Sequence, residues 1–216
     1  MRFTRSLLIS AAFVLIGVAV AAWLWHRLPI MVPSHWNWAG EVDGWLPRFW
    51  AAAIPSLGVL VLALLTWLLP VVSPTRFRIA PFANVFTGLM LVIQGFILVI
   101  GVCVLLAGAG YALPMPRVAM LGASALMMVL GNYMGKLQRN FFIGIRTPWT
   151  LASAATWERT HRLAGRLFVI AGLLALLGTA FGLPFWIGVG CILAAVLIPA
   201  LYSFIIYRRV EGTPED

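Results

Sequence analysis

Apolar runs of about twenty residues recur along this chain, and they restrict its possible folds more than any other feature. As a helix, each run is long enough to cross a hydrocarbon core about 30 Å thick. Hydrophobic residues make up 62% of the chain and charged residues only 10%, whereas soluble domains carry about 25% charged residues. The sequence therefore predicts an all-α polytopic membrane protein, one integral membrane domain over residues 1–216. The six expected spans are 6–25, 50–69, 86–107, 118–134, 167–183 and 186–207.

The 15 Lys and Arg residues divide unevenly between the two sides that six spans define. Twelve lie in the N-terminal segment, the second and fourth loops and the C-terminal tail, whereas Arg27, Arg48 and Arg117 lie in the other loops. Cytoplasmic loops carry the excess of basic residues in membrane proteins. We therefore expect cytoplasmic N and C termini, a cytoplasmic loop 135–166 and an extracytoplasmic loop 26–49. The net charge of +9 then indicates topology and contact with the anionic lipid bilayer, with no direct nucleic-acid binding.

The first span has an alternative interpretation as a secretory signal peptide. Arg2 and Arg5 precede the apolar run, and the small residues at 19–21 are typical of a cleavage site. The run nevertheless continues to Trp25, which is long for the core of a signal peptide. An uncleaved first span is therefore the favoured interpretation.

The predicted spans lack the residues that most membrane chemistry requires. None has Asp, Glu, Lys, Arg or His near its middle, and such residues are the usual mark of ion-coupled transport. Gln94 is the most polar residue deep in a span, where hydrogen bonding between helices is the expected role. Cys103 and Cys191 fall within spans and form no CxxC or Cys/His motif. The sequence therefore predicts no cofactor, no metal site and no catalytic residues.

The extracytoplasmic loop 26–49 combines aromatic and polar side chains. We expect a recognition surface there, formed by His35, Trp36, Asn37 and Asp43, because aromatic anchors with a few polar groups are typical of binding sites. Two alternatives stay open. Tryptophans of the loop could anchor it at the headgroups, and His35, Glu41 and Asp43 could ligate a metal, although their spacing matches no defined site.

The loop 135–166 holds six of the basic residues and is the most distinctive part of the chain. Thr147 followed by Pro148 predicts the start of a helix, with the threonine as its N-cap. We expect this helix to run to residue 166 and to lie along the membrane face. On it, Trp157 and His161 share a face, and Glu158 and Arg162 form an i,i+4 ion pair.

Specific hydrogen-bonding side chains accompany these basic residues, where topology alone would need only positive charge. An arginine offers a planar fork of donors that suits a carboxylate or a phosphate. Headgroup contact is the alternative for the arginines, and Glu158 with His161 is the single possible metal half-site or acid–base pair. The candidate ligand-binding or signalling residues are Asn132, Asn140, Arg146, Thr147, Trp149, Trp157, His161 and Arg162.

These motifs resemble a known family. The run Ile-Gly-Ile-Arg-Thr-Pro-Trp at 143–149, with the residues from Gly131 to Arg166 around it, is similar to the SdpI family of bacterial membrane proteins. The first loop, residues 28–44, resembles a small N-terminal domain of unknown function that often accompanies this family. The typical member of the family is the immunity protein against the sporulation-delaying-protein toxin.

The resemblance implies a six-span protein of the bacterial inner membrane without known catalysis. A typical member protects its cell against a membrane-acting toxic peptide, and holds a small cytoplasmic repressor at the membrane when the toxin is bound. A toxic peptide outside the cell and a repressor inside it are therefore the expected partners. The alternative function is a membrane enzyme or transporter that acts on a lipid-linked or small polar substrate at the cytoplasmic face.

Overall fold

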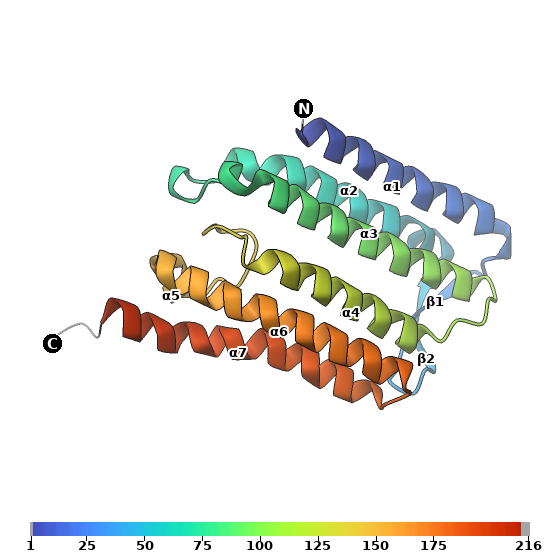
Figure 1. Ribbon diagram of the computed structural model, residues 1–216. Helices are drawn as coiled ribbons and strands as arrows, with labels where there is room; N and C mark the ends of the chain where they lie inside the picture. The colour runs from blue at the N-terminus through green and yellow to red at the C-terminus, as the bar shows by residue number, and fades with distance from the viewer. Residues whose placement is uncertain (1, 213–216) are drawn as a thin grey trace. The chain divides into compact units, whose positions relative to one another are not determined.

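The computed structural model describes residues 2–212, and six of its helices are long and apolar enough to cross a membrane (Figure 1). The predicted class of multi-pass helical membrane protein is therefore confirmed, and the orientation of its termini stays a prediction. The six helices are α1 (Arg2–Leu24), α2 (Arg48–Val72), α3 (Ala83–Gly108), α4 (Met115–Met134), α6 (Ala154–Ala180) and α7 (Phe185–Glu211).

The chain divides into two compact units. Unit 1 holds the residues up to Trp67 together with Met90–Ala123, and unit 2 holds Leu68–Leu89 together with the residues from Ser124 onward. Helices α2, α3 and α4 therefore each contribute to both units. The candidate recognition loop lies in unit 1, and the polar segment after α4 lies in unit 2.

Unit 1 contains a β-hairpin that the sequence did not predict. Strand β1 (Met31–Trp36) pairs antiparallel with β2 (Val42–Pro47), and the pairing is irregular around His35. At the turn, the side-chain oxygen of Asn37 accepts hydrogen bonds from the backbone N–H groups of Ala39 and Glu41, each at 3.0 Å. The base of the hairpin is fixed because Val32 is fully buried in an apolar cluster with Leu24, Leu28, Ala51 and Leu105.

Unit 2 is built around a close approach of α4 and α6. A Cβ atom on Gly131 would lie 2.7 Å from the carbonyl oxygen of Gly165, and one on Gly165 would lie 2.9 Å from that of Gly131. Helices that pack in membranes use small residues in this way, because their backbones can then touch. This contact fixes the end of α4, from which the polar segment leaves.

The prediction of one amphipathic helix over residues 147–166 is wrong. The chain instead forms the short helix α5 (Pro148–Ala152), breaks at Ser153 and begins α6 at Ala154, so that the fifth span starts well before residue 167. The break is stable because the Ser153 hydroxyl caps α6 by accepting the Thr156 N–H at 3.2 Å. Because Thr156, Thr160 and His161 are buried, the polar start of α6 packs inside unit 2.

Candidate functional site

The polar segment of unit 2 leaves α4 in a turn that is tied to α6. The Leu137 N–H donates to the Met134 carbonyl at 3.2 Å. The Leu137 carbonyl in turn accepts a hydrogen bond from the indole N–H of Trp157 at 2.7 Å. Trp157 is only 3% exposed, so this bond forms away from water, where it is electrostatically stronger. Trp157 therefore serves as a buried anchor for the segment.

Asn140 organises the next turn with its whole side chain. Its carbonyl oxygen accepts the N–H groups of Phe142 at 2.8 Å and Ile143 at 2.9 Å. Its amide nitrogen donates to the carbonyls of Gln138 at 2.8 Å and Ile143 at 3.1 Å. The side chain is fully buried, so these partners replace water completely. Asn140 therefore organises this turn, and its polar side-chain atoms are bonded to the backbone.

His161 holds the middle of the segment through both of its ring nitrogens. Its Nε2 accepts the Ile145 N–H at 3.0 Å, so this nitrogen carries no proton, and its Nδ1 donates to the Trp157 carbonyl at 2.8 Å. The imidazole also stacks on Trp157, with ring centroids 4.0 Å apart. The hydrogen bonds thus fix a neutral tautomer. The predicted common face of Trp157 and His161 is confirmed.

The predicted cap of α5 is confirmed, and it connects the segment to α7. Thr147 accepts the Thr150 N–H at 3.3 Å, and the Thr150 hydroxyl accepts the Thr147 N–H at 2.9 Å, a reciprocal capping box. The hydroxyls of Thr147 and Ser203 lie 3.1 Å apart. The indole of Trp149 donates to the same Ser203 hydroxyl. Two residues of the helix start therefore share one hydroxyl of α7.

The charged members of the candidate set lie on the surface of unit 2. Arg146 is exposed and donates to the Phe141 carbonyl. Arg162 is exposed and pairs with Glu158, which confirms the predicted i,i+4 ion pair. Asn132 is exposed on α4 and donates only to the Met128 carbonyl, at 3.3 Å, so it stands apart from the network around His161. Arg146 and Arg162 are therefore the charged members of the set that are exposed to a partner.

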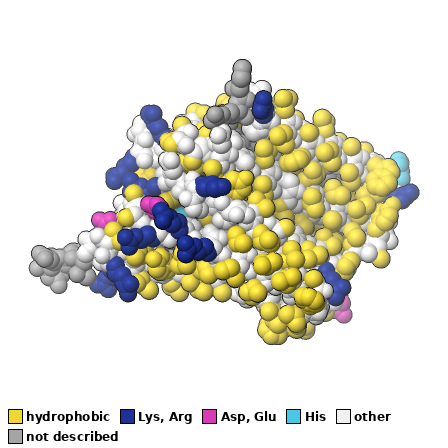
Figure 2. Space-filling model, in the orientation of Figure 1, with side chains coloured by type: hydrophobic (Ala, Val, Ile, Leu, Met, Phe, Trp, Pro, Cys, Tyr) yellow, Lys and Arg dark blue, Asp and Glu magenta, His cyan; other side chains and the backbone are white. Residues whose placement is uncertain are grey.

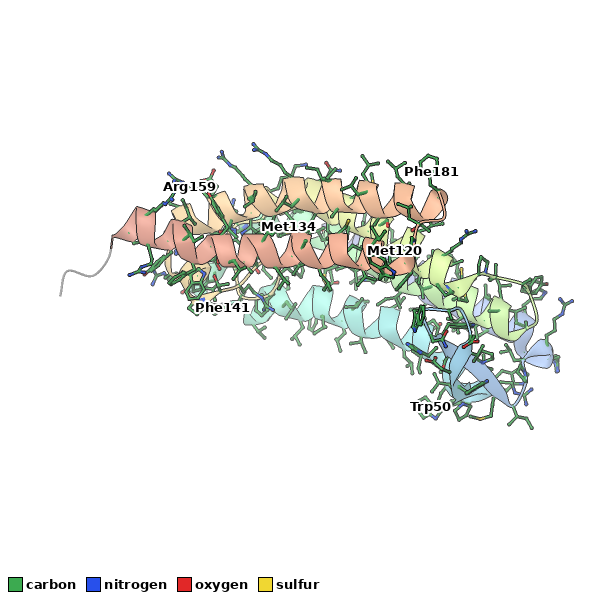
Figure 3. All side chains as sticks on the ribbon, turned by 90° about the horizontal axis from the view of Figure 1, so that it is seen from below. Trp50, Met120, Met134, Phe141, Arg159 and Phe181 are labelled. Carbon is green, nitrogen blue, oxygen red and sulfur yellow. The ribbon has the colours of Figure 1, made fainter. Side chains whose placement is uncertain are left out.

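Figure 2 shows the surface on which these charges lie. Most of the dark-blue Lys and Arg side chains in this view lie around the end of unit 2 where α5 and the end of α7 lie, whereas the surface along the helices is mostly hydrophobic. Figure 3 shows Arg159 at the start of α6, on the outside of unit 2, and Phe141 in the loop before α5. The arrangement combines a buried, hydrogen-bonded framework with an exposed basic surface.

The geometry does not support the acid–base or metal interpretation of Glu158 and His161. Both nitrogens of His161 bond to backbone groups, and His161 is only 1% exposed. The carboxylate of Glu158 points to the surface, where it pairs with Arg162. A general base must reach a substrate proton, and this buried imidazole has no free nitrogen for one.

The candidate recognition residues of the hairpin form two separate polar pairs. His35 Nδ1 lies 2.5 Å from a carboxylate oxygen of Asp43, and Asn37 donates to Glu41 at 2.9 Å. Because Glu41 bonds to Asn37, the set proposed for a metal does not converge. Among residues 2–212, no three His, Cys, Asp or Glu side chains lie close enough together to hold a metal ion. His35 remains largely exposed, with 72% of its side chain accessible. Trp36 lies beside this pair, opposite Val42 in the register of the hairpin.

Three residues of the network in unit 2 were not predicted from the sequence. Thr150 stands three residues after Thr147, a spacing that indicates a capping box. Gly144 has a positive φ of +107°, a backbone conformation that the Ile-Gly-Ile motif alone does not predict. Ser203 lies far along the chain in α7, and no sequence pattern connects it with Trp149.

Comparison with known proteins finds two family models that match separate parts of this chain. Residues 136–206, which include most of the site, match the family model of the SdpI/YfhL protein family. Residues 12–59, which include the hairpin, match a domain of unknown function (DUF1648). The Immunity protein SdpI of Bacillus subtilis (strain 168) is 29% identical over 111 residues, which are 50% of this chain and 54% of that relative. No solved structure matches the chain.

The fold and the matched segments define a multi-pass bacterial membrane protein. Its N-terminal part carries the DUF1648 region, and its C-terminal part carries the network around His161. The chain is similar to the SdpI family over residues 136–206, and half of the chain aligns with Immunity protein SdpI. It spans about half the length of the curated relative that it matches, 54%.

Proposed function

We propose that this protein is a membrane immunity protein that protects its cell against a membrane-acting toxic peptide. The observation that carries the proposal is the 29% identity to Immunity protein SdpI over 111 residues. The match of residues 136–206 to the SdpI/YfhL family supports it, because this range includes Asn140, Arg146, Trp157 and His161.

The hairpin is the part of the protein that we assign to peptide recognition. Trp38 is 81% exposed and Trp45 is 52% exposed, so both offer large amphipathic rings. The exposed His35–Asp43 pair adds hydrogen-bonding groups beside them. Exposed aromatic side chains around a few polar groups suit the recognition of a peptide that is itself partly buried in the membrane.

The basic segment of unit 2, residues 135–166, is the part that we assign to signalling toward a small cytoplasmic repressor. Its backbone is held by Asn140, Trp157 and His161, so the exposed Arg146 and Arg162 are presented from a fixed frame. A planar guanidinium on a rigid support recognises a carboxylate with little loss of conformational entropy. No observation favours the alternative enzyme or transporter function.

The immunity function has a direct test. We expect the protein to restore growth to Bacillus subtilis strain 168 cells that lack their own SdpI, under challenge with the sporulation-delaying-protein toxin. The measurement is survival at increasing toxin concentration, with membrane levels of the protein checked in parallel. If cells that contain the protein in their membrane are as sensitive as cells without any SdpI, the protein does not protect against this peptide.

Arg146→Lys tests whether the basic segment is a specific site. Lysine keeps the charge and loses the planar fork, so binding of a carboxylate partner should weaken by about tenfold. The matched control is Arg159→Lys, since Arg159 is an exposed arginine on the same unit. We expect only Arg146→Lys to lower output from the linked repressor. If the two variants lower the output equally, the segment acts only through its positive charge and is not a specific site.

The predicted orientation is tested by cysteine labelling. Ser153 is buried as the cap of α6, so the exposed Ala154 is the better position on that loop, and the exposed Ala39 reports on the hairpin. In a background with Cys103→Ala and Cys191→Ala, we expect Ala39→Cys to react with an impermeant maleimide in intact cells. Ala154→Cys should react only after the membrane is opened. The reverse pattern would overturn the proposed sidedness.

A further inference from the structure

A basic pocket of about 640 Å³ opens on unit 2 next to the candidate site. Four basic side chains, Arg76, Arg78, Lys136 and Arg139, line it together with the single carboxylate of Glu158. The first two come from the loop between α2 and α3, and the other two come from the turn after α4. The pocket therefore lies just beyond the ends of membrane-crossing helices, at the level expected for lipid headgroups.

The loop that carries Arg76 and Arg78 is held in place through Phe77. The Phe77 ring packs edge-on against Phe141, with centroids 4.2 Å apart, and lies under the guanidinium of Arg139 at 5.4 Å. The hydroxyl of Ser73 donates to the Phe77 carbonyl at 2.7 Å. Because Phe77 is fixed on three sides, the arginines before and after it are presented together at the pocket wall.

Some charged side chains of the pocket have hydrogen-bond or ion-pair partners, and others have none among the described residues. Arg139 donates to the carbonyls of Leu151 and Ala152 at the end of α5, at 3.3 and 2.9 Å. The carboxylate of Glu158 is paired with Arg162, so it does not neutralise the wall opposite. Within residues 2–212, Arg76 and Arg78 have no ion pair or hydrogen bond of their own. Three guanidinium groups and one ammonium group therefore line the pocket without a carboxylate partner among the described residues, and those of Arg76 and Arg78 also lack a carbonyl partner.

We infer that this pocket binds the phosphate group of an anionic phospholipid headgroup. Two neighbouring guanidinium forks match phosphate oxygens through paired, charge-assisted hydrogen bonds. The volume is that of a small-molecule site, which suits a headgroup. Basic pockets beside the ends of transmembrane helices bind anionic headgroups in this way. The inference does not rest on the immunity function, and it assigns a ligand to the loop between α2 and α3.

The test measures binding of phosphatidylglycerol to the purified protein by native mass spectrometry, with the zwitterionic lipid phosphatidylcholine as the reference without net charge. In the double variant Arg76→Gln/Arg78→Gln, we expect the Kd for phosphatidylglycerol to rise by about tenfold, because charge-assisted bonds to phosphate are lost. Lys136→Gln, on a different element, should also raise the Kd. The matched control is Arg208→Gln/Arg209→Gln, which removes the same charge from exposed positions at the end of α7.

The expected result is weaker binding in both pocket variants and unchanged binding in the control, with all variants eluting as the wild type on size exclusion. An equal loss in the control would show that only net charge matters, and would overturn the assignment. Unchanged binding in Arg76→Gln/Arg78→Gln would overturn it as well. Inorganic phosphate is added in a separate series. If it displaces the lipid fully at low concentration, the site binds free phosphate and the assignment to a headgroup fails.

Discussion

Replacement of Asn140 by alanine is expected to lower the free energy of unfolding by about 3 kcal/mol, because a fully buried side chain and its four hydrogen bonds to the backbone are lost. The side chain satisfies the N–H groups of Phe142 and Ile143 and the carbonyls of Gln138 and Ile143. Alanine supplies no replacement, and the fully buried position admits little water. The measurement is chemical unfolding in detergent, followed by the fluorescence of the tryptophans.

Asn132→Ala is the matched control for this prediction. Asn132 is exposed, and its side chain makes a single hydrogen bond, to the Met128 carbonyl. We expect a change within about 0.5 kcal/mol, as for most surface substitutions. If the two alanine variants unfold alike, Asn140 does not organise the segment, and the fixed frame proposed for Arg146 loses its support.

The helices of this protein were predictable because lipid requires long apolar runs. Each expected span overlaps a helix of the structure, and the fourth ends at Met134 as predicted. The start of α6 was missed because its first turns are polar. Thr156, Thr160 and His161 look like surface residues in the sequence, but all three are buried in unit 2. The preceding loop contacts His161, which accepts a hydrogen bond from the Ile145 N–H. Tertiary packing thus overrode the local polarity pattern.

The hairpin shows a second limit of sequence reasoning. Pro33 and Pro47 disfavour regular strands, and both nevertheless lie in the two-stranded sheet, where edge positions leave the missing N–H unneeded. Its stability comes from Val32, which packs against residues of α1, α2 and α3 far away in the chain. Contacts of this kind have no local signal.

The sequence predicted several residues of the candidate site, but it did not predict the hydrogen bonds that join them across separate elements. Thr147 as a cap and Trp157 with His161 on one face follow from local spacing, which a helix fixes. The hydrogen bonds from the Ile145 N–H to His161 and from the Trp149 indole to Ser203 join separate elements, and no spacing rule indicates them. The sequence therefore indicated the residues of the site. Only the structure shows which of them are buried and hold the backbone and which are exposed.

Gly144→Ala is expected to be the most disruptive small substitution in the segment. Gly144 has a φ of +107°, which costs an L-residue about 1–2 kcal/mol. A Cβ atom there would also lie 2.4 Å from Nε2 of His161, the atom that accepts the Ile145 N–H. Relieving this overlap requires the imidazole to move, which should add about 1–3 kcal/mol and break the bond to Ile145.

Gly110→Ala separates the two contributions. Gly110 has a similar φ of +94°, and a Cβ atom there would meet nothing within 4 Å. It should therefore cost only the backbone strain, about 1–2 kcal/mol, while Gly144→Ala costs more and also reduces protection in the growth assay. If both variants lose equal stability, the overlap with His161 does not matter. In that case the Nε2–Ile145 hydrogen bond is not what positions the segment, and Arg146 must be presented by the Asn140 turn and the α5 cap alone.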